Sequence, residues 1–265
     1  MNKILVPVDF SDTSLNALSY AIKLFGSSSV EITILHIYGI KSTALLMKSI
    51  DGLLEKDAQR SMDELIEKVQ KEFPKIAMKT KIVLNDTVTA ITSLGNSGKY
   101  DYIVMGTKGA SGLKEVFIGS IAGGVISKTK KAPVIVVPRF YYYNSLDEIV
   151  FAISDNPLSN TTVIEPLRKI AKMHKSKIKV LHITEKQTSD IQETLNQLKD
   201  LNPSVTYAFG TGNTNADLND YLKKNDSKLL CLIRGKKDFF DRLFGESVTL
   251  KQTFSSPVPL LILHD

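Results

Sequence analysis

The feature that most constrains the fold is an alternation of short apolar runs with longer segments of helical periodicity. The apolar runs are rich in valine and isoleucine, as in residues 30–38 (VEITILHIY), and such runs are typical of strands. Between the runs, apolar residues recur three or four positions apart, as in Leu15, Leu18, Ile22 and Phe25, which is the spacing of one helix face. Because parallel strands need crossover connections, this alternation favours a parallel α/β sheet with helices on both faces.

The first half of the chain is predicted to contain five strands. They are expected at residues 4–8, 30–38, 75–84, 102–105 and 134–137. Ser11 and Asp86 suit the N-cap positions of the first and third helices, and Pro74 ends a long second helix that is expected over residues 43–73. The order βαβαβαβαβ predicts a doubly wound, Rossmann-like sheet.

The same order of elements returns in the second half of the chain. Strands are expected at 148–153, 177–183, 205–209, 229–233 and 258–263, with helices at 158–174, 190–201, 216–224 and 243–253. Such a recurrence is an internal repeat. We therefore predict two tandem doubly wound domains of five strands each, over residues 1–139 and 147–265. The aromatic segment between them, residues 139–146, is expected to pack between the halves.

Glycines follow the fourth strand at a spacing that favours anion binding. They are Gly106, Gly109 and Gly119, and Ser120 follows the last of them. Glycine adopts positive φ and lets a ligand approach the backbone N–H groups, and a helix that begins near Gly119 presents its first amides, including that of Ile121, to the same place. A strand, a glycine loop and a helix N-terminus form a typical phosphate cradle. In a doubly wound sheet the ligand is expected at the carboxyl ends of the strands.

The glycine spacing, together with residues 6–18 (VPVDFSDTSLNAL), resembles the ATP-binding motif and the opening signature of the universal stress protein family. The resemblance implies a tandem member of this family with an adenine-nucleotide α-hydrolase-like fold, which binds ATP or another adenine nucleotide with Mg²⁺. It places Asp9 at the ribose or at the phosphate-bound Mg²⁺, and it places four residues around the adenine: Pro7, Val8, Ile37 and Met105. Without the glycine loop, Asp9 would instead be interpreted as a carboxylate that favours the start of a helix.

The second half departs from the glycine motif. Gly235 is matched to Gly106, but Asp238 then takes the place of Gly109, and the next glycine and serine come three residues early, in Gly245-Glu246-Ser247. A carboxylate in such a loop repels phosphate. We expect Asp9 to correspond to Ser154, or to Asp155 one residue out of register. The second half is therefore predicted to have lost nucleotide binding and to keep its fold for pairing. The family resemblance implies that residues 134–137 pair with residues 258–263 in an intramolecular pseudo-dimer.

Composition excludes several other classes of protein. The net charge of +6 is spread along the chain, which favours a solvated surface over a nucleic-acid site. The single cysteine, Cys231, lies in an apolar run and excludes an intrachain disulfide framework. The sequence shows no signal peptide and no apolar stretch of about 18 residues, so we expect a cytoplasmic protein without a membrane partner. His36 and His182 lie in expected strands, where structural histidines are usual, and no zinc spacing is present.

Two functions of different classes fit these features. The first is a stress-response binding module that holds ATP in its first half and regulates a protein partner. The alternative is a slow ATPase or phosphoryl-transfer enzyme that uses the same loop, although no catalytic residue can be named and no nucleophile elbow is present. A third, nucleotide-free interaction protein also stays open, as does further pairing into a homodimer.

Overall fold

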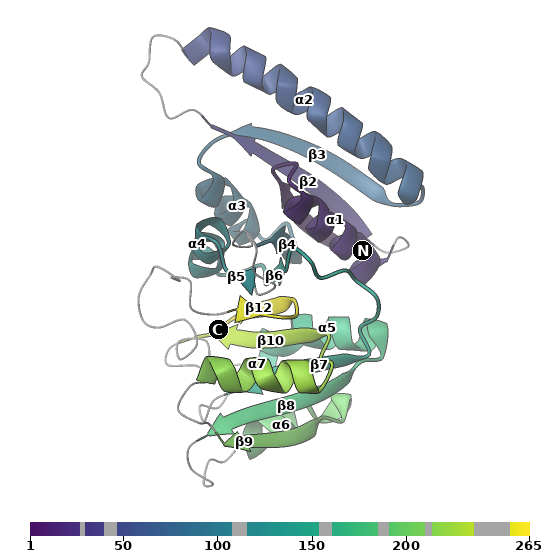
Figure 1. Cartoon of the computed structure of the whole chain (residues 1–265), viewed down its shortest axis with the longest axis vertical. Coiled ribbons are helices and arrows are strands. Elements are labelled where there is room, and N and C mark those ends of the chain that lie inside the picture. The colour runs from purple at the N-terminus through teal and green to yellow at the C-terminus, as the bar shows by residue number, and fades with distance from the viewer. Residues whose placement is uncertain are drawn as a thin grey trace.

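In the computed structural model, a single large sheet runs through the whole molecule (Figure 1). The structure describes residues 1–26, 30–39, 47–107, 116–153, 161–184, 191–209, 214–235 and 255–265. Within them the strands of the sheet lie side by side in this order: β3 (Ala77–Leu84), β2 (Val30–Tyr38), β1 (Asn2–Val8), β4 (Tyr102–Gly106), β6 (Val134–Val137), β12 (Leu260–His264), β10 (Leu229–Arg234), β7 (Glu148–Ile153), β8 (Lys177–Thr184) and β9 (Ser204–Phe209).

Neighbouring strands of this sheet are parallel with one exception. β6 and β12, at the centre, are antiparallel, with Ile135 opposite Leu261. On each side of this seam the strands follow the same order, so the mostly parallel α/β architecture predicted from the sequence is confirmed. The pairing expected between the segments that contain β6 and β12 is present, although β12 runs from Leu260 to His264 rather than over residues 258–263.

The helices connect the strands and cover both faces of the sheet. They are α1 (Asp12–Phe25), α2 (Met47–Glu72), α3 (Thr87–Asn96), α4 (Ser120–Lys128), α5 (Glu165–His174), α6 (Gln192–Gln197) and α7 (Thr214–Lys224), with short 3₁₀ turns η1 (Thr161–Ile164) and η2 (Lys199–Leu201). Ser11 and Asp86 cap α1 and α3 as predicted, because their side chains accept hydrogen bonds from the amides of Ser14 and Thr89. The helix expected over 190–201 is divided into α6 and η2, and the one expected over 243–253 lies outside the described residues.

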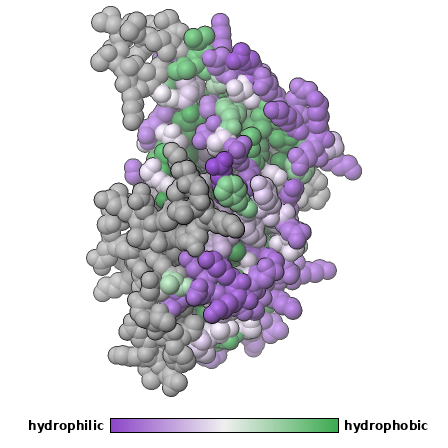
Figure 2. Space-filling model, viewed as in Figure 1, coloured by the Kyte–Doolittle hydropathy of each residue, from purple (hydrophilic) through white to green (hydrophobic). Residues whose placement is uncertain are grey.

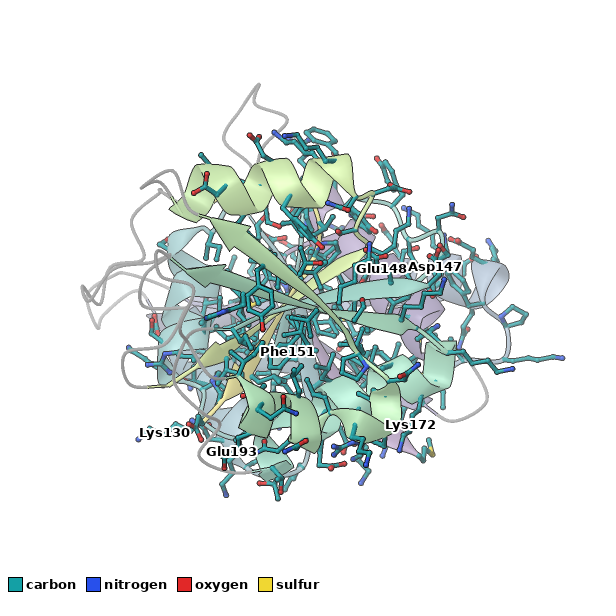
Figure 3. All side chains as sticks on the ribbon, turned by 90° about the horizontal axis from the view of Figure 1, so that it is seen from below. Lys130, Asp147, Glu148, Phe151, Lys172 and Glu193 are labelled. Carbon is teal, nitrogen blue, oxygen red and sulfur yellow. The ribbon has the colours of Figure 1, made fainter. Side chains whose placement is uncertain are left out.

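Two apolar clusters, one on each face, hold these layers together. Side chains of α1, α2 and α5 pack on one face and those of α3, α4 and α7 on the other. Seen from below in Figure 3, Phe151 of β7 lies in the middle of the sheet, with Lys172 of α5 and Glu193 of α6 on one side of it. The outer side of α7 is hydrophilic in the lower part of Figure 2, whereas Leu218 and Leu222 on its inner side are buried. This is the amphipathic pattern of a helix on a sheet. None of the described helices is both long and apolar enough to span a membrane.

The aromatic segment after β6 packs inward at alternate residues. Tyr141 and Tyr143 lie with their ring centroids 6.2 and 5.5 Å from that of Tyr20, and the Tyr141 hydroxyl donates a hydrogen bond to the Lys228 carbonyl at 3.0 Å. The Tyr143 ring also lies beside that of His174 in the second half, with centroids 6.2 Å apart, so the packing between halves is confirmed for these two tyrosines. Tyr142, in contrast, is 71% exposed, because successive side chains of an extended segment point in opposite directions.

A two-stranded ribbon outside the main sheet was not predicted. β5 (Val116–Phe117) precedes α4 and pairs antiparallel with β11 (Ser255–Ser256), which precedes β12. Each strand has only two residues, which is too short for a periodicity signal in the sequence.

Candidate functional site

The first candidate residue, Asp9, is held in place by the N-terminus of α1. Its Oδ1 accepts hydrogen bonds from the Ser11 amide at 3.1 Å and from the Ser11 hydroxyl at 2.5 Å. Burial alone would raise the pKa of Asp9, but the hydrogen bonds from Ser11 and Ser14 outweigh this effect and hold the pKa below its ordinary value. Asp9 is therefore an oriented, ionised carboxylate at neutral pH.

Phe10 gives the adjoining turn a strained backbone. Its φ of 62° lies in the left-handed region, which is rare for a bulky residue. The ring packs against that of His36 in a tilted arrangement, with centroids 4.5 Å apart, and His36 Nδ1 donates to the Val8 carbonyl at 2.9 Å. His36 thus has the structural role that the sequence predicted, and it joins the ends of β1 and β2. Strained residues of this kind often lie beside ligand sites.

Gly106, at the end of β4, is required by close packing. A Cβ at this position would lie 2.7 Å from the carbonyl oxygen of Thr13 in α1. The absence of a side chain therefore lets the first turn of α1, with Asp9 in front of it, approach the end of β4. The close packing of α1 on the end of β4 thus brings Asp9 and Gly106 to the same edge of the sheet, and this packing does not depend on a ligand.

The N-cap residue of α4 is a glycine, which has no side chain to cap the helix. Gly119 occupies this position with φ of −66° and ψ of 164°, and among the described residues no side chain caps the first turn. The first amides of a helix lack partners within the helix, and Ser120 and Ile121 are exposed. Because α4 connects the parallel strands β4 and β6, its N-terminus lies at the carboxyl edge of the sheet. The helix can therefore donate hydrogen bonds to an anion there.

The four residues expected around an adenine lie on different faces of the sheet. Met105 is buried in the cluster that contains α4, and Ile37 packs against this cluster while half-exposed. Val8 is buried in the cluster on the opposite face, so only its backbone could contribute on the α4 side. Pro7 precedes Val8 in the strand and is half-buried, and alternation places it on the face of Met105.

Some predicted features lie outside the described residues, among them Gly109. Within the residues that the structure describes, no group of three or more histidine, cysteine or carboxylate side chains could hold a metal ion.

The second half differs from the sequence-based alignment at the glycine motif. Ile103 of β4 pairs with Val134, and Leu230 of β10 pairs with Leu260 in the same way. Gly106 lies three residues after Ile103, and Ile233 lies three residues after Leu230. Gly106 therefore corresponds to Ile233 and not to Gly235. The expected match was wrong by two residues, because β10 is one residue longer than β4, and because Gly235 follows the last residue of β10, whereas Gly106 is itself the last residue of β4.

The same ladders decide the counterpart of Asp9. Leu5 pairs with Ile103, and Val150 pairs with Leu230. Four residues beyond Leu5 is Asp9, and four residues beyond Val150 is Ser154, so the register favours Ser154 over Asp155. Both of these residues, and the loop after Gly235, lie outside the described residues.

Taken together, the fold and this edge define a doubly wound α/β protein with an oriented carboxylate and an uncapped helix N-terminus at the carboxyl ends of its strands. Residues 1–138 match the model of the universal stress protein family. The chain belongs to the universal stress protein family, and the resemblance seen in its sequence is confirmed.

Individual relatives cover the first half or the whole of the chain. Universal stress protein YxiE of Bacillus subtilis is 31% identical over 149 residues, which cover 51% of this chain and 98% of YxiE. Universal stress protein MJ0577 of Methanocaldococcus jannaschii is 29% identical over 154 residues, or 52% of this chain and 94% of the relative. A universal stress protein structure from Archaeoglobus fulgidus covers 98% of this chain and 95% of its own, with a TM-score of 0.60 at 20% identity. This last likeness shows that the fold of the whole chain occurs in another protein.

Proposed function

We propose that the protein binds ATP or another adenine nucleotide at the carboxyl edge of its first-half strands and acts as a nucleotide-dependent regulatory module in the stress response. The observation that carries the proposal is the uncapped N-terminus of α4 at the edge where Asp9 is held. Phosphate oxygens would accept hydrogen bonds from the amides of Ser120 and Ile121. Apolar surface for the adenine would come from Met105 and Ile37.

Asp9 suits the ribose or the metal and not the phosphates themselves. Its negative charge repels phosphate, but its Oδ2 can accept a hydrogen bond from a ribose hydroxyl or from the hydration shell of Mg²⁺. A bound Mg²⁺ would neutralise part of the charge of the phosphates. The hydrogen bonds from Ser11 would keep the carboxylate oriented for either contact.

We propose further that residues 1–139 and 147–265 are two domains that form an intramolecular pseudo-dimer. The repeated strand order and the β6–β12 seam support this division. In the second domain, Ile233 places a branched side chain at the position of Gly106, which supports loss of its nucleotide site. The cytoplasmic location, a protein partner and a further homodimer stay predictions.

Proline at the first position of α4 tests the role of the helix amides. Ser120→Pro removes one N–H but suits the start of a helix, and the extended backbone of Gly119 is compatible with a following proline. A charge-assisted hydrogen bond contributes about 1.5–3 kcal/mol, so we expect calorimetry with ATP to show a loss of affinity of about tenfold or more. Ser120→Ala keeps the amide and should bind nearly as the wild type does.

The matched control is Thr87→Pro at the first position of α3, where Asp86 also has an extended backbone. This variant should leave ATP affinity unchanged. Equal affinity of Ser120→Pro and the wild type would contradict the proposed site. The same samples distinguish binding from catalysis, because ADP formed over many turnovers would identify the alternative slow ATPase, whereas retained ATP supports a binding module.

A further inference from the structure

We infer that the second half of the chain positions α4 for nucleotide binding, and that Arg234 is the positioning residue at the C-terminal end of this helix. The inference rests on the proposed function, because it concerns the helix whose first amides would hold the phosphates. It assigns to the second half a role in a site that lies in the first half.

Arg234 binds the end of α4 across the seam. Its Nη1 donates a hydrogen bond to the carbonyl of Ile126 at 3.2 Å. The Val125 carbonyl accepts from the Thr129 amide at 2.9 Å, so Ile126 carries the next carbonyl of the helix and lacks a partner within it. A cation at this end also interacts favourably with the helix dipole. Arg234 therefore stabilises the end of α4 that points away from the proposed ligand.

The second half also holds the chain just before α4. Ser255 lies opposite Phe117 and Ser256 opposite Val116 in the β5–β11 ribbon, and only two residues separate β5 from the first residue of α4. Ser256 is 2% exposed, and its hydroxyl donates to the Val258 carbonyl at 2.7 Å. β11 is thus joined firmly to the segment that leads into β12.

Apolar packing connects these two contacts. Ile118, between β5 and α4, is 5% exposed and belongs to the same cluster as Val258 and Leu232 of the second half. Ala122 and Val125 on the inner face of α4 lie in this cluster as well. The second half therefore contacts the chain just before α4 and the end of α4, and it shares one apolar cluster with the inner face of this helix.

These contacts bear on affinity because α4 has no cap of its own. In α1 and α3 a side chain orders the first amides, whereas the glycine N-cap of α4 provides none. The direction of the α4 amides then depends on where the whole helix is held. Small displacements of positioning groups have large effects on bound ligands, so loosening the far end of α4 should weaken nucleotide binding.

The test measures ATP affinity by calorimetry on the full chain with Arg234→Met and Arg234→Lys. Methionine keeps most of the aliphatic stem but cannot donate a hydrogen bond, whereas lysine keeps a cationic donor. We expect Arg234→Met to weaken ATP binding by about five- to tenfold and Arg234→Lys to restore it to within about twofold of the wild type. The matched control is Tyr141→Phe, which removes another hydrogen bond to the second half, to the Lys228 carbonyl, without touching α4. It should leave ATP affinity unchanged.

The outcomes separate this inference from the proposed function. Failure of the wild type to bind ATP would overturn the proposed function itself. Wild-type binding with unchanged affinity in Arg234→Met would overturn the inference alone, as would an equal loss in Tyr141→Phe or a failure of lysine to restore binding. If Arg234→Met does not fold, hydrogen exchange of the wild type decides, since ATP should slow exchange in peptides that contain Ser255 and Ser256, and unchanged exchange there would refute the coupling.

Discussion

Acidification should destabilise the protein through His264, the last residue of β12. This residue lies beside Arg234 in the strand ladder. Burial and the Arg234 guanidinium lower its pKa from 6.5 to about 4, against a smaller opposing effect of the Ala132 backbone. The folded state therefore keeps the imidazole neutral at pH values where the unfolded chain binds a proton. Its contribution to stability is complete above pH 6.5 and is lost as the pH falls through the range between the two pKa values.

The size of the effect follows from the two pKa values. One pH unit of difference corresponds to about 1.4 kcal/mol, so the fall of the pKa from 6.5 to about 4 corresponds to about 3 kcal/mol of unfolding free energy. Urea unfolding of the wild type and of His264→Gln, measured at about pH 7 and about pH 4, isolates this contribution because all other groups titrate in both proteins. Between about pH 7 and about pH 4, the unfolding free energy of the wild type should fall by about 3 kcal/mol more than that of the variant. Parallel pH profiles for the two proteins would refute the reasoning.

Three further predictions concern stability and reactivity. Gly106→Ala should lower the unfolding free energy by about 1–3 kcal/mol in urea, because its Cβ would lie 2.7 Å from atoms of α1. Gly52→Ala, in open space on α2, should raise it by about 0.5–1 kcal/mol, and equal effects would contradict the packing argument. Tyr20→Phe should be neutral or stabilising by about 1 kcal/mol, since the buried hydroxyl finds no hydrogen-bond partner among the described residues, whereas Tyr102→Phe should cost about 1 kcal/mol because its hydroxyl is bonded at 2.8 Å. Cys231 is 0% exposed and burial raises the pKa of its thiol, so a thiol reagent should modify it only after unfolding, and rapid labelling of the native protein would contradict this.

The local features of the fold could be predicted from the sequence because their causes are local. The strands follow from apolar runs, and the caps at Ser11 and Asp86 follow from side chains that reach amides three residues away. The second-half register could not be predicted in this way. Matching Gly235 to Gly106 relied on residue type, whereas the register is set by backbone pairing, in which Ile103 and Leu230 donate to Pro133 and Pro259 respectively.

The candidate site was predicted only in part for a similar reason. The sequence indicated Asp9, Gly119 and Ser120 because they lie at the ends of recognisable elements. It gave no sign of the positive φ of Phe10 or of the contact between its ring and that of His36. Arg234 was also missed, because its partner lies 108 residues away in the chain and no local pattern marks a contact of this kind.

The β6–β12 seam has a consequence for how the two halves can change over time. In an assembly of identical chains, each substitution is present in every copy. Here both strands of the seam belong to one polypeptide, so the two halves can carry different residues at matching positions. Arg234 of the second half corresponds to Thr107 of the first half, which is a much shorter residue. Covalent linkage therefore permits unequal partners, and dilution cannot separate them.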